Sequence, residues 1–76
     1  MNNNQAPTFF AALRWAADQV AAHHIDPHAP YFLLTMHYGW DDTHLLVHQR
    51  EQMPAADWQW FRQAINRLKN DEPAQY

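Results

Sequence analysis

The chain has 76 residues, of which 47% are hydrophobic and 14% aromatic, with no cysteine and a net charge of −3 when histidines are neutral. This length fits one small domain, and the missing cysteines exclude disulfides and thiolate metal sites and favour a reducing, cytoplasmic setting. The charge argues against a nucleic-acid partner and against an anionic membrane surface.

The start of the chain, residues 1–7, is polar and is expected to be a disordered leader. A helix is predicted over about residues 8–23, because apolar side chains recur there at helical spacing. This stripe consists of Phe9, Leu13, Ala16 and Val20, and is widened by Phe10, Ala17 and Ala21. The hydroxyl of Thr8 is suited to cap the first turn.

Two short helices are predicted in the middle of the chain. The apolar run over residues 31–38 fits a buried strand or a buried helix by pattern alone. Gly39, the only glycine, follows it where a helix end favours a positive φ, so we predict a helix over about 30–38. Asp26-Pro27 is interpreted as the helix-start signal before it. A third helix is expected over about 42–48, capped by Asp41 or Asp42.

The last helix is predicted over about residues 54–70, with Pro54 at its first position. Its apolar stripe consists of Trp58, Phe61, Ile65 and Leu68. We expect this helix to provide the apolar surface against which the rest of the chain packs. The predicted fold is therefore an all-α bundle over residues 8–70, with two long helices around one or two short ones and with 71–76 starting a linker.

Six histidines raise the question of a metal site. His44 and His48 are four residues apart, as are His24 and His28, so each pair could share a helix face. Zinc usually takes three or four ligands, and the glutamate of an HExxH motif is missing because Leu45 follows His44. We therefore predict no metal site, and expect structural or surface histidines.

Catalytic patterns are also missing. The chain has no serine or cysteine, and Thr8 and Thr43 are interpreted as helix caps. Asp41 and Asp42 are adjacent, which turns their side chains to different sides of a helix start. One glycine is too few for a phosphate-binding loop. We predict no catalytic and no cofactor-binding residue in this chain.

The tryptophans and arginines are the candidates for a partner surface. Trp58 lies on the apolar stripe and is expected in the core, whereas Trp60 lies off it. Partly exposed tryptophans are common at interfaces, although four tryptophans also fit a core that covers several faces. The predicted partner-contacting residues are Trp60 and three cations on polar helix faces, Arg14, Arg62 and Arg67.

Three sequence features occur in a characteristic order. They are Leu33-Leu34 closed by Gly39-Trp40, then the Leu-rich turn Thr43–Val47, then an Arg-bearing helix that runs into Glu72-Pro73-Ala74-Gln75-Tyr76. Over about residues 8–76 this order resembles the N-terminal domain of the HemK (PrmC) family of release-factor glutamine methyltransferases. The family usually has a glycine where this chain has Asp71.

The resemblance implies a helical substrate-docking domain that is not catalytic by itself. The longer enzyme would use S-adenosylmethionine to methylate the glutamine of the Gly-Gly-Gln loop in bacterial peptide chain release factors. The family's cofactor loop and Asn-Pro-Pro-Tyr motif belong to a following domain, so no catalytic or cofactor residue is carried over to this chain. The implied partner is the release factor, and the domain is expected to be a cytoplasmic monomer. The alternative is a stand-alone helical protein-interaction module.

Overall fold

A computed structural model describes residues 6–70 of the chain. Its helices are α1 (Phe9–Ala21), α2 (Ala29–Tyr38), α3 (Asp42–His48) and α4 (Ala55–Asn70). The predicted all-α class is confirmed. The first and last residues of each predicted helix lie within two positions of those of the observed helix. Residues 1–5 of the expected leader and the expected linker start at 71–76 lie outside the described residues.

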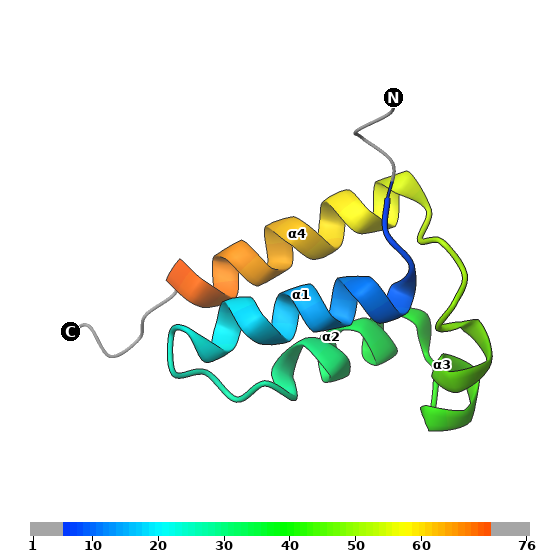
Figure 1. Cartoon of the computed structure of the whole chain (residues 1–76), viewed down its shortest axis with the longest axis horizontal. Helices are drawn as coiled ribbons and strands as arrows, with labels where there is room; N and C mark the ends of the chain where they lie inside the picture. Colours follow the sequence, from blue (N-terminus) through cyan, green and yellow to red (C-terminus); the bar gives the residue numbers. More distant parts are fainter. Residues whose placement is uncertain (1–5, 71–76) are drawn as a thin grey trace.

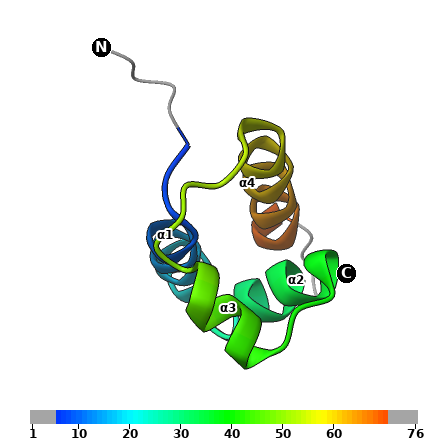
Figure 2. The ribbon, with the colours of Figure 1, turned by 90° about the vertical axis from the view of Figure 1, so that its right-hand side faces the viewer.

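The centre of the bundle is α1, which lies beside both α4 and α2 (Figures 1 and 2). Phe9, Ala12, Ala16 and Val20 of this helix are each at most 4% exposed. The distance between packed helices depends on the side chains at the contact, so the two alanines let the neighbouring helices approach α1 closely. The expected role of α4 was therefore wrong, because α1 is the helix on which both α4 and α2 pack. The expected packing of a long helix on a short one is found between α1 and α2, and the two long helices also pack directly on each other.

On α4, two of the four predicted stripe residues are fully buried, Phe61 and Ile65. Trp58 was expected in the core, but it is only partly buried at the edge, where its ring meets that of Trp15 edge-on at 5.3 Å. On α1, the expected widening of the stripe was wrong for Phe10, which is 50% exposed, and for Ala21, which is also exposed. Ala12 is buried instead, because the buried face is centred between the two neighbouring helices.

The connection between α3 and α4 runs beside the start of α1. The N–H groups of Phe9 and Phe10 donate to the carbonyls of Glu51 and Gln49 at 3.0 and 2.9 Å, so first-turn donors of α1 find partners outside the helix. The Met53 N–H donates to the Pro7 carbonyl at 2.8 Å. Ala6, expected in the leader, is only 8% exposed, so packing begins before Thr8.

Helix caps are confirmed at the starts of α1 and α3. The Thr8 hydroxyl accepts a hydrogen bond from the Ala11 N–H at 3.1 Å. The Asp41 carboxylate accepts one from the His44 N–H at 3.0 Å and contacts the His44 ring at 2.8 Å. These contacts, the backbone one foremost, hold the pKa of Asp41 below its usual value.

Three other expected helix starts are corrected. Thr43 lies inside α3, because Asp41 already caps that helix. Pro54 precedes α4 by one residue, and its carbonyl accepts the Trp58 N–H at 2.9 Å. Asp26 closes a turn before α2 by accepting the His28 N–H at 2.9 Å, so it does not cap the helix itself.

Two helices end in the same hydrogen-bonding pattern. After α2, the Trp40 N–H donates to the Thr35 carbonyl at 2.9 Å and the Gly39 N–H to the Met36 carbonyl at 3.3 Å, with Gly39 at φ 69°. After α1, Ile25 and His24 make the equivalent bonds, but His24 adopts φ 62°. This is the Schellman motif, in which the left-handed position favours glycine. The predicted role of Gly39 is confirmed, and His24 occupies the same position at a conformational cost.

Substitutions at these two positions should change stability in opposite directions. Gly39→Ala should lower the free energy of unfolding by about 1 kcal/mol for backbone reasons alone, since an added Cβ meets no atom within 4 Å. His24→Gly should raise it by roughly 0.5 kcal/mol. Urea unfolding followed by circular dichroism measures both. Gly39→Asn is the control and should cost less than alanine, and an equal loss for Asn and Ala would contradict the left-handed assignment.

A polar contact joins the end of α2 to the start of α4. The Tyr38 hydroxyl donates to the Asp57 carboxylate, and the Tyr38 ring packs edge-on against Phe9 at 5.6 Å and stacks on Trp40 at 4.5 Å. Burial, followed by the hydrogen bond and the charge of Asp57, raises the pKa of Tyr38 above its usual value. The protonated hydroxyl thus connects the end of α2 to the start of α4, close to Phe9 at the start of α1.

Tyr38→Phe should lower the free energy of unfolding at pH 7 by about 1–2 kcal/mol, because it removes a hydrogen bond to a charged group. The folded-state pKa is raised, so this contribution is complete below about pH 10 and is lost as the pH rises further. Urea unfolding of both proteins between pH 7 and 11 measures the difference, with Tyr31→Phe on the same helix as control. A difference that stays constant up to pH 11 would contradict the assignment.

Candidate docking groove between two helices

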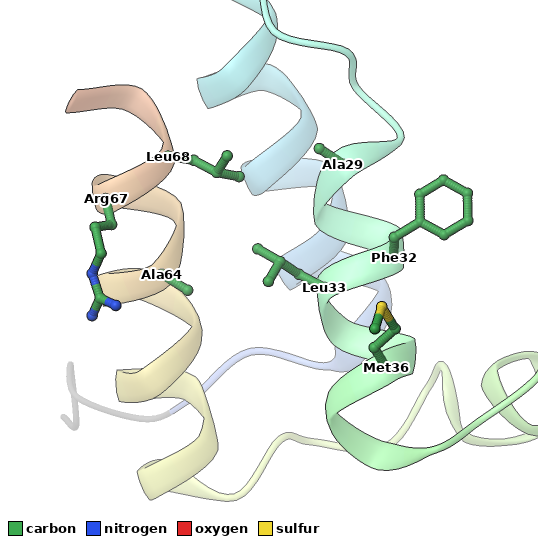
Figure 3. A pocket seen from close by; sticks show the side chains of 7 residues that line it. All are labelled: Ala29, Phe32, Leu33, Met36, Ala64, Arg67 and Leu68. Carbon is green, nitrogen blue, oxygen red and sulfur yellow. The ribbon is translucent and has the colours of Figure 1, made fainter. Parts of the chain in front are cut away.

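Helices α2 and α4 each pack mainly on α1, and a hollow of about 490 Å³ lies between them. Figure 3 shows Leu33 of α2 and Leu68 of α4 pointing toward each other, whereas Phe32 points outward from α2. The lining residues, which define the α2–α4 groove, are Ala29, Phe32, Leu33, Met36, Ala64, Arg67 and Leu68. All but Arg67 are apolar, so the groove combines an apolar surface with one cation.

The exposed apolar residues of the groove were not predicted. The run 31–38 was interpreted as buried, yet Phe32 is 56% and Met36 80% exposed. Only one side of α2 can face α1, and a helix that is apolar all round must then leave apolar side chains on its other sides. The signal in the sequence was therefore the absence of a polar face in this segment. Soluble monomers seldom expose large contiguous apolar patches without a binding role.

An aromatic stack joins α2 and α4 next to the groove. Trp60 lies one turn before Ala64 on α4, and its ring stacks on that of His37 of α2 at 3.8 Å and 17°. Trp60 is partly buried against the core, so only part of its surface is left for a partner. The stack joins α2 and α4 beside Met36 and holds the two walls of the groove together.

The three predicted arginines are all exposed, but they line different hollows. Arg67 lies in the α2–α4 groove. Arg62 lies with Trp15 in a hollow between α1 and α4, and its guanidinium carbon is 5.3 Å from the centre of the Trp58 ring. Arg14 lies with Phe10 in a hollow between α1 and the start of α2. The structure therefore brings Trp60 and Arg67 to the edges of one groove and places Arg14 and Arg62 elsewhere.

The rings of His44 and His48, one of the two predicted histidine pairs, make local side-chain contacts. The His48 ring lies 3.0 Å from the Glu51 carboxylate and stacks on Trp40 at 4.8 Å, whereas the His44 ring contacts Asp41. The two rings of this pair thus have different partners. Over residues 6–70, no group of three side chains of the metal-binding types comes together.

None of the helices within residues 6–70 combines the length and the apolar content needed to cross a bilayer.

Comparison with known proteins confirms the resemblance found in the sequence. Residues 11–76 match the family model described as the PrmC N-terminal domain. The release factor glutamine methyltransferase of Enterococcus faecalis is 31% identical over 71 residues, which are 93% of this chain and 26% of that protein. The chain thus spans about a quarter of the length of this curated relative. No solved structure matches the chain significantly. By the family match and this identity, the chain belongs to the PrmC N-terminal domain family of release-factor glutamine methyltransferases.

Proposed function

We propose that this chain is the substrate-docking domain of a protein-glutamine methyltransferase that acts on peptide chain release factors. The observation that carries the proposal is the exposed α2–α4 groove, an apolar surface that the rest of the described chain leaves uncovered. The family membership supplies the partner, because the curated relative is named for its action on a release factor. The domain itself would bind the substrate and take no part in the chemistry.

Docking at a surface away from the reacting atoms would still accelerate methyl transfer. A domain that holds the release factor makes the encounter of its glutamine with the active site intramolecular, which raises the effective concentration of that glutamine. The longer enzyme would take the methyl group from S-adenosylmethionine and work in the cytoplasm. The described residues would contribute contact area and orientation.

Each predicted partner-contacting residue has its own place in this proposal. Arg67 and Trp60 lie along the α2–α4 groove and would touch the release factor directly. Arg14 and Arg62 lie over other hollows and would contact it only if the interface extends around α1. A partner that covers only the face with the α2–α4 groove would therefore contact Arg67 and Trp60 but neither Arg14 nor Arg62.

The 76-residue chain should bind a peptide chain release factor on its own. Titration of the isotope-labelled chain with the release factor, followed by amide chemical shifts, measures this. We expect saturable shifts concentrated on α2 and α4, with Kd in the micromolar range that is typical of weak, transient contacts. Serum albumin serves as the control protein. Unchanged spectra at millimolar release factor would contradict the proposed function.

A further inference from the structure

The chemistry of the α2–α4 groove restricts what it can bind. Leu33, Ala64 and Leu68 line it from both helices, and the exposed Phe32 and Met36 stand at its α2 side (Figure 3). A partner side chain that entered would replace water on apolar surface, so the groove favours an apolar side chain over a polar one. The described part of the chain has no free strand edge, which argues against a partner that adds a β-strand.

The length of the groove sets the size of the partner segment. Its α2 side extends from Ala29 to Met36, which at 1.5 Å per residue is roughly 10 Å. Two turns of a partner helix have about this length and present two or three side chains on one face at i, i+3 or i+4, and i+7. A short amphipathic helix therefore matches a groove between two helices.

The charge beside the groove indicates which type of residue the partner should carry next to its apolar side chains. Among residues 6–70, Arg67 is the only charged residue that lines the hollow. Between residues 58 and 70, α4 carries Arg62, Arg67 and Lys69 and no carboxylate. Arg62 lies in the hollow beside Trp15, and the Lys69 ammonium donates to the Gln19 side chain of α1, so Arg67 is the cation of α4 that these described residues place at the groove. A carboxylate in the partner would gain a charge-assisted hydrogen bond from Arg67.

A second copy of this chain fits the groove less well. In a symmetric dimer the same surface would face itself, so both grooves would contribute Arg67, and none of the lining residues within 6–70 is an acid. Like charges at such an interface are unfavourable. The occupant is therefore better supplied by a different protein.

We propose that the α2–α4 groove binds an amphipathic helix of the release factor, with two or three apolar side chains in the groove and a carboxylate against Arg67. This inference rests on the proposed function and deepens it, because it names the surface and the chemistry of the partner segment.

The test compares matched surface variants in binding to the release factor, by titration calorimetry or fluorescence anisotropy. Met36→Glu places a charge in the groove, and Leu46→Glu places the same charge on α3 at an apolar position that is 65% exposed. Both positions are exposed, so both variants should fold, which circular dichroism checks. We expect Met36→Glu to raise Kd at least tenfold and Leu46→Glu to change it less than twofold.

Two substitutions at Arg67 separate its charge from its packing. Arg67→Met keeps an apolar side chain of similar length and should weaken binding about threefold, whereas Arg67→Glu should weaken it tenfold or more and reduce its salt dependence. Equal effects of Met and Glu would contradict the carboxylate partner. Exchanging an acidic residue of the release factor helix for lysine should restore the binding of Arg67→Glu.

The outcomes separate this inference from the proposed function. Normal binding by Met36→Glu and Arg67→Glu would overturn the groove assignment and leave the docking function standing. A release factor that binds none of the proteins would overturn both. Self-association of the chain in light scattering that is lost in Met36→Glu would assign the groove to a second copy and overturn the inference as well.

Discussion

The fold depends on the burial of α1 from two sides. Ala12, Ala16 and Val20 are fully buried along this helix, and the two alanines let α4 and α2 come close to the same backbone. A chain this short buries a smaller share of its surface than a larger domain does, so part of its apolar surface stays exposed. The connection before α4 completes the arrangement by supplying carbonyls to the first N–H groups of α1.

The same constraint produces the groove. Helices α4 and α2 both pack mainly on α1, and they meet each other where His37 stacks on Trp60 and where Tyr38 donates to Asp57. Beyond that end the two helices leave apolar side chains uncovered, among them Met36 at 80% exposure. The exposed groove is therefore a consequence of how the core is built.

Elements with strong local signals could be predicted from the sequence. Gly39, Thr8 and Asp41 mark helix ends through their own backbone or side-chain chemistry, and the apolar spacing of α1 and α4 gives their helical spans. The helix arrangement could not be predicted, because periodicity tells which face of a helix is apolar but not which neighbour covers it. The groove was missed for the same reason, since exposure of Phe32 and Met36 depends on where α4 lies. His24 was missed because a histidine carries no signal for a left-handed conformation.

Site-specific photo-crosslinking tests the docking account most directly. A photo-reactive phenylalanine analogue is introduced in place of Met36 in the groove, or in place of Leu46 on α3, and each protein is irradiated with the release factor. The account predicts a crosslink from position 36, mapped by mass spectrometry to an amphipathic helix with an acidic residue, and little from position 46. A crosslink from position 46 with none from position 36 would contradict it.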